Sequence, residues 1–92
     1  MTEPVRTSVL IENARGLHAR ASAKFVACAR QYDANVIVSR EGQEADASSI
    51  MDLLMLAAGP GSEIELNASG PQAREAIAAL SELVKSRFGE EA

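Results

Sequence analysis

The apolar residues of this chain follow two different periods, and each period predicts its own kind of element. Strict alternation over residues 5–11 and 62–69 predicts two strands, each with one buried face. Residues 35–40 predict a third strand, and residues 43–47 can pair back on it because Glu41-Gly42 is a turn signal. Leu10 is an exception, since it falls on the polar side of the first strand.

Helical spacing predicts three other segments. From Ala19 to about residue 32, apolar residues recur every three to four positions. A short second helix is expected to begin at Ser49, which opens a Ser-x-x-Asp pattern, and to stop before residues 58–61. A third is expected from Gly70-Pro71 through Phe88, with Gly89 after its end and a frayed tail at about residues 90–92.

The resulting order, β-α-β-β-α-β-α, predicts a single α+β domain over residues 1–92. Because each strand has at most one apolar face, we expect an antiparallel or mixed sheet covered by helices on one side only. The hydrophobic fraction is 47%, but only three residues are aromatic, so the core must consist of aliphatic side chains and methionine.

Charge and cysteine content exclude several classes of protein. Residues 1–30 hold five basic and two acidic side chains, whereas residues 31–92 hold four basic and eleven acidic ones. The acidic balance and the scarcity of aromatic residues argue against a nucleic-acid-binding module, and the basic excess near the start favours an anionic ligand there. The single Cys28 allows no internal disulfide and is expected to be a small core residue. Without a signal-like start or a membrane-spanning segment, a cytoplasmic protein with no membrane insertion is expected.

The chemistry points to His18, the only histidine, which lies where the first strand leads into the first helix. A neutral imidazole is a nucleophile near pH 7. The free N–H groups and positive dipole end of a helix suit an anion, and Arg20 adds a fixed positive charge. This combination predicts phosphate carried on the histidine.

Gly16-Leu17-His18-Ala19-Arg20 resembles the active-centre signature of HPr, the histidine-containing phosphocarrier of the bacterial phosphotransferase system. A second motif, residues 47–51, resembles the regulatory serine segment of the same family. The resemblance implies an HPr-like open-faced β-sandwich, with four antiparallel strands and three helices on one face. It also implies that enzyme I phosphorylates Nδ1 of His18, that Gly16, Ala19 and Arg20 stabilise the phosphate, and that an enzyme II A-type component receives it.

The same resemblance suggests partner and regulatory residues. Ser49 would be phosphorylated by an HPr kinase/phosphorylase, although either Ser48 or Ser49 could cap the second helix. Such a carrier acts with partner enzymes, is not itself an enzyme, and is expected to be a monomer. Contacts with enzyme I and the acceptor are expected from exposed apolar and basic residues, namely Leu17, Arg15, Lys24, Ile50, Met51 and Leu54.

Two departures and two alternatives remain open. Ala21 stands where the family usually has proline, and Arg15 adds a charge where small polar residues are common. Such variation resembles members that serve a nitrogen-type regulatory phosphorelay rather than sugar uptake. The second alternative, from a different class, is a small ligand-binding regulatory module, which does not need the histidine signature. No cofactor is expected, and one histidine and one cysteine are insufficient for a metal site.

Overall fold

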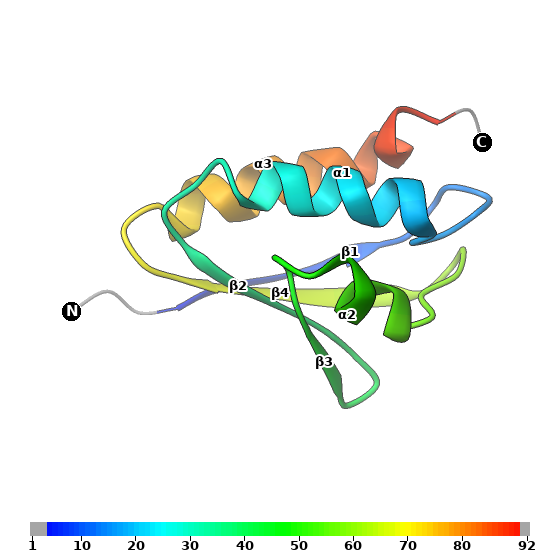
Figure 1. Cartoon of the computed structure of the whole chain (residues 1–92), viewed down its shortest axis with the longest axis horizontal. Helices are drawn as coiled ribbons and strands as arrows, with labels where there is room; N and C mark the ends of the chain where they lie inside the picture. Colours follow the sequence, from blue (N-terminus) through cyan, green and yellow to red (C-terminus); the bar gives the residue numbers. More distant parts are fainter. Residues whose placement is uncertain (1–3, 91–92) are drawn as a thin grey trace.

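The structure is a computed structural model, and it describes residues 4–90. Its elements follow the expected order of strands and helices (Figure 1). They are β1 (Val5–Leu10), α1 (Ala19–Ala29), β2 (Asn35–Arg40), β3 (Gln43–Asp46), α2 (Ile50–Met55), β4 (Glu63–Ser69), α3 (Ala73–Lys85) and the short 3₁₀ turn η1 (Arg87–Gly89).

The four strands form one antiparallel sheet in the order β1-β4-β2-β3. The register pairs Val9 with Ile64 and Val38 with both Leu66 and Ala45, so the buried side chains of all four strands share one face. Leu10 pairs with a glutamate on the other face and is 47% exposed, which explains why it broke the alternation. The predicted one-sided sheet is confirmed.

The helices cover the apolar face of this sheet. α1 and α3 lie side by side across it, and α2 packs against α1 and β3 (Figure 1). Phe25 of α1, Leu53 of α2 and Leu80 of α3 are fully buried between these layers, and Cys28 is partly buried against the same core. The fold expected from the resemblance, four antiparallel strands with three helices, is therefore confirmed. Within residues 4–90, no helix is long and apolar enough to cross a membrane.

The predicted ends of the third helix were wrong. Its N-cap is Gln72, so Pro71 precedes the helix, and its last residue is Lys85 rather than Phe88. Arg87 and Phe88 both have left-handed backbone, with φ of 58° and 55°. This turn places the Phe88 ring in the core, where burial of a large apolar side chain outweighs the cost of the strained conformation.

The expectation of a frayed tail from residue 90 was also wrong for Glu90. After the left-handed turn, the Glu90 side chain forms hydrogen bonds with Asn13 and His18. Two specific bonds to groups that are largely buried hold this residue in place. Residues 91 and 92 lie outside the described residues.

Candidate functional site

His18 is the N-cap of α1, with φ −75° and ψ −178°. Its carbonyl oxygen accepts the first helical hydrogen bond from the Ser22 N–H at 2.8 Å. Within residues 4–90 no side chain caps this helix end. The N–H groups of the first turn, Ala19 and Arg20 among them, thus face no competing side-chain acceptor, which is the arrangement that suits an anion.

Gly16 holds the loop before His18 in a conformation that other residues rarely adopt. Its φ is +64°, and a Cβ at this position would lie 2.5 Å from the carbonyl oxygen of Ala58 and 2.8 Å from Cα of Gly59. The next N–H, that of Leu17, donates to the same Ala58 oxygen at 2.8 Å. The histidine loop is therefore docked on the segment that follows α2, and this contact requires glycine.

Glu90 binds the far nitrogen of the imidazole. Nε2 of His18 lies 2.5 Å from Oε2 of Glu90, while Oε1 of the same carboxylate accepts a hydrogen bond from Nδ2 of Asn13 at 3.0 Å. The hydrogen bond from His18, followed by that from Asn13, lowers the pKa of Glu90 below its usual range, and the nearby charge of Arg15 adds to this. An ionised carboxylate can only accept, so Nε2 carries a proton, and in the neutral form of the ring Nδ1 keeps the lone pair.

No signal in the sequence identifies Glu90 as part of the site. It is 72 positions from His18, in a segment whose composition is typical of a terminal tail. Its position depends on the left-handed turn at Arg87 and Phe88, residues that do not favour such backbone. Only the packed structure brings the two together.

The basic residues near His18 have different surroundings. Arg20 is exposed and forms no side-chain hydrogen bond or ion pair with any residue that the structure describes. Arg15 is exposed on the loop. Lys24 donates to the carbonyl oxygen of Phe88 at 2.6 Å, so its ammonium group fixes the C-terminal turn. Arg20 and Arg15 are thus the cations whose side chains are available to a ligand or partner.

The predicted apolar contacts are divided between core and surface. Leu17 is only 5% exposed and belongs to the core, and Leu54 is half-buried. By contrast, Met51 is 68% exposed and Met55, which the sequence did not single out as a contact, is 73% exposed. Together with exposed Ile50 they form a patch on α2, called here the α2 patch.

Ser49 is the N-cap of α2, as one of the two alternatives predicted. Its hydroxyl oxygen accepts a hydrogen bond from the Asp52 N–H at 3.2 Å. The Ser48 hydroxyl instead donates to a carboxylate oxygen of Asp46 at 2.7 Å, and this bond helps to lower the pKa of Asp46. Ser49 therefore stands at the start of the helix that carries the α2 patch.

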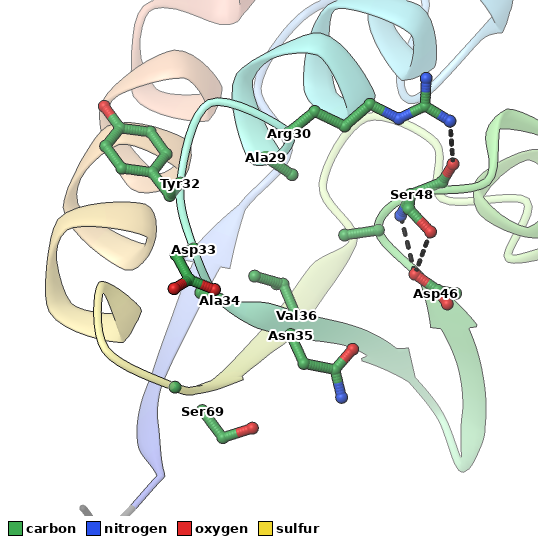
Figure 2. Close-up of a pocket in the computed structure, with 12 residues that line it drawn as sticks. Ala29, Arg30, Tyr32, Asp33, Ala34, Asn35, Val36, Asp46, Ser48 and Ser69 are labelled. Atoms are coloured by element: carbon green, nitrogen blue, oxygen red, sulfur yellow. Dashed lines mark hydrogen bonds between the residues drawn. The ribbon is translucent and has the colours of Figure 1, made fainter.

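A groove of about 550 Å³, lined by both polar and apolar residues, lies at the opposite end of α1 (Figure 2). Arg30 crosses its rim and donates to the carbonyl oxygen of Ser48 at 3.2 Å. Eleven helical residues, about 16 Å, separate this groove from His18. It holds neither the histidine nor the cations beside it, and among residues 4–90 no three His, Cys, Asp or Glu side chains gather as a metal ion would require.

One known protein family matches most of this chain. The family model of the "PTS HPr component phosphorylation site" matches residues 5–86. The chain belongs to the HPr family. HPr-family proteins are phosphoryl carriers of the phosphotransferase system rather than enzymes, and the chain is accordingly a carrier with a phosphohistidine site. The rival interpretation, a ligand-binding module in which the histidine is incidental, loses its support.

Individual HPr-family members are similar over most of their length. The phosphocarrier protein HPr of Cupriavidus necator is 50% identical over 80 residues, which cover 87% of this chain and 90% of the relative. The phosphocarrier protein NPr of Escherichia coli is 42% identical over 88 residues, covering 95% and 98% of the two chains. The crystal structure of HPr-C-His from Thermoanaerobacter tengcongensis superposes with a TM-score of 0.92 at 36% identity, over 96% of this chain and 99% of that one.

Proposed function

We propose that this HPr-family chain accepts a phosphoryl group on Nδ1 of His18 from phosphorylated enzyme I and donates it to an enzyme II A-type component. The observation that carries the proposal is the Glu90 carboxylate on Nε2 of His18, at a helix N-terminus without a side-chain cap. It leaves one ring nitrogen with a lone pair, beside N–H groups that suit an anion.

The transfer uses these groups in a definite order. The lone pair of Nδ1 attacks the phosphorus of the donor's phosphohistidine, the new N–P bond forms, and the bond between phosphorus and the donor nitrogen breaks. Nε2 of His18 keeps its proton, and the carboxylate of Glu90 stabilises the positive charge that the phosphorylated ring gains. The first-turn N–H groups of Ala19 and Arg20, with the Arg20 guanidinium, stabilise the phosphoryl oxygens.

The partner proteins are proposed to dock on the α2 patch and on the basic residues near His18. Met51 and Met55 expose flexible apolar side chains that adapt to more than one partner, as a carrier with a donor and an acceptor requires. Arg15 and Arg20 would steer acidic partner surfaces towards His18. Lys24 is a weaker candidate because it is bonded to Phe88, and Leu17 supports the loop from the core.

Regulation at Ser49 by a kinase/phosphorylase is proposed for the same docking surface. A phosphate on this N-cap would add about two negative charges at the start of the helix that carries the α2 patch. Such charge would disturb apolar contact and oppose an acidic partner surface.

Phosphorylation by phosphoenolpyruvate and enzyme I tests the proposed function. The wild-type protein should gain one phosphoryl group that is labile in acid and stable in alkali, and His18→Ala should gain none. Because His18 is the only histidine, the result cannot be attributed to a second site. Arg20→Ala should slow transfer while the melting temperature stays unchanged. Label retained by folded His18→Ala would contradict the assignment.

The choice between the sugar and nitrogen branches can be tested with the phosphorylated protein. Relatives named HPr are 40–50% identical to this chain and the one named NPr is 42% identical, so sequence identity does not separate the two branches. Faster transfer to a sugar-type than to a nitrogen-type enzyme II A component would assign the chain to the sugar branch, and the reverse order would assign it to the nitrogen branch.

A further inference from the structure

We propose that Asn13 is a positioning residue for His18 that acts through Glu90 and thereby determines which ring nitrogen is phosphorylated. The inference rests on the proposed function of His18. Asn13 lies in the loop between β1 and α1, and it is 0% exposed. Its side chain does not bond to the histidine, so any effect on the imidazole must pass through its own partners.

The Asn13 amide donates two hydrogen bonds, and each one fixes a different side of the site. One goes to the carbonyl oxygen of Gly16 at 2.8 Å and holds the turn that leads into His18. The other goes to Oε1 of Glu90 at 3.0 Å and orients the carboxylate whose second oxygen lies on Nε2. One buried side chain thus holds both the loop that carries the ring and the group that binds it.

The hydrogen-bonding requirements of this position favour asparagine. A carbonyl oxygen and a carboxylate are both acceptors, so the residue between them must donate twice, which the amide NH₂ group does and an ionised aspartate cannot do. The remaining polar atom, Oδ1 of Asn13, is buried without a partner, which lowers the stability of the fold. The two donated bonds offset this cost, and one of them fixes the orientation of Glu90.

The consequence is a choice between two nitrogens. While Glu90 accepts the Nε2 proton, Nε2 has no lone pair and is covered by the carboxylate, so only Nδ1 can attack phosphorus. Without the Asn13 bond, Glu90 loses the contact that orients it, and both nitrogens of the ring become available. Asn13 therefore determines the position of phosphorylation.

A small phosphoryl donor tests this without any partner protein. With phosphoramidate, a ring nitrogen attacks phosphorus, the P–N bond of the reagent breaks and ammonia leaves, and ³¹P and ¹⁵N NMR identify the phosphorylated nitrogen. Wild type should react almost entirely at Nδ1, with only a trace of Nε2 product. Asn13→Ala, the volume-conserving Asn13→Leu, and Glu90→Ala should each raise the Nε2 product at least tenfold.

The controls separate positioning from general destabilisation. Asn67→Ala removes a half-buried amide on the open face of the sheet and should leave the product unchanged. Because Asn13 acts through Glu90, the double variant Asn13→Leu/Glu90→Ala should give no more Nε2 product than Glu90→Ala alone. Thermal unfolding of each variant shows whether it is folded at the temperature of the reaction.

Three outcomes would overturn the inference. Exclusive Nδ1 product from Glu90→Ala would show that the carboxylate does not select the nitrogen, whatever the Asn13 variants do. More Nε2 product from Glu90→Ala but not from folded Asn13→Leu would show that Asn13 does not position Glu90. More Nε2 product from the double variant than from Glu90→Ala alone would show that Asn13 does not act through Glu90. Failure of enzyme I to phosphorylate wild type would instead contradict the proposed function, while the phosphoramidate result would stand.

Discussion

At the scale of single residues, Gly16 makes the closest backbone approach beside the site, and this leads to a prediction about stability. Gly16→Ala adds a Cβ at φ +64° that meets the Ala58 carbonyl oxygen at 2.5 Å. We expect the free energy of unfolding, measured by urea denaturation, to fall by about 1–2 kcal/mol from the left-handed backbone alone, and further from the clash.

Gly42→Ala is the matched control for this prediction. Its φ is +84°, but a Cβ there meets nothing within 4 Å, so it carries the backbone strain without the contact. The difference between the two variants measures the close approach of the histidine loop to residues 58 and 59. Equal losses of unfolding free energy in both variants would show that the close approach does not contribute to stability.

The residues of the site differ in how far the sequence could predict them. His18, Gly16 and Arg20 lie within five positions of one another, so their chemistry is visible in a short motif. Glu90 bonds His18 across 72 positions, and Asn13 bonds Glu90 rather than the ring. The bond to His18 follows a left-handed turn in which Arg87 and Phe88 precede Gly89. No local pattern encodes such a contact, because it depends on where Phe88 finds room in the core.

At the scale of elements, α2 has a side-chain N-cap at its start and carries the α2 patch. The effect of the cap on stability can be measured separately from the effect of the patch on enzyme I binding. Ser49→Ala removes the hydroxyl that accepts from the Asp52 N–H, so the free energy of unfolding should fall by about 1 kcal/mol. Ser49→Asp keeps a capping oxygen and should preserve stability, yet its charge should weaken enzyme I binding several-fold in calorimetry.

Ser48 supplies the control for both measurements. Its hydroxyl donates to exposed Asp46 rather than capping the helix, so Ser48→Ala should cost less than about 0.5 kcal/mol. Ser48→Asp places its charge one residue earlier, where Arg30 bonds the main chain, and should affect binding less than Ser49→Asp. Equal weakening by the two aspartates would point to net charge rather than to the start of α2.

Elements with a strong local period were predictable, and their ends were predictable only where a local signal marks them. The Ser-x-x-Asp pattern predicted the start of α2, and the strand predicted over residues 35–40 has the observed bounds of β2. The end of α3 has no comparable signal: Ser86, Arg87 and Phe88 could continue a helix. Burial of the Phe88 ring and the Lys24 bond to its carbonyl, both tertiary contacts, decide the outcome.

At the scale of the whole molecule, the chain closes on itself through Glu90, and this closure should depend on pH. The pKa of Glu90 is lowered by the hydrogen bonds from His18 and Asn13, and that of Asp46 by bonds from Ser48. Near neutral pH both carboxylates are ionised in the folded and the unfolded chain. As the pH falls through about 4, the unfolded chain takes up protons first, so the free energy of unfolding decreases.

This stabilisation is present above the ordinary carboxylate range and is lost as the pH falls through the lowered pKa values of the folded protein. Urea midpoints measured between about pH 2 and pH 7 should therefore decline towards acid. Glu90→Gln should remove part of that slope, and Asp46→Asn another part. In wild type, the imidazole ¹⁵N signals of His18 should change over the same pH range as the urea midpoint, because Glu90 bonds the ring. In Glu90→Gln this shared change should be absent. If the double variant Glu90→Gln/Asp46→Asn shows the same dependence of the urea midpoint on pH as wild type, other carboxylates cause the acid sensitivity. The bonds of Glu90 to His18 and Asn13 would then contribute no stability.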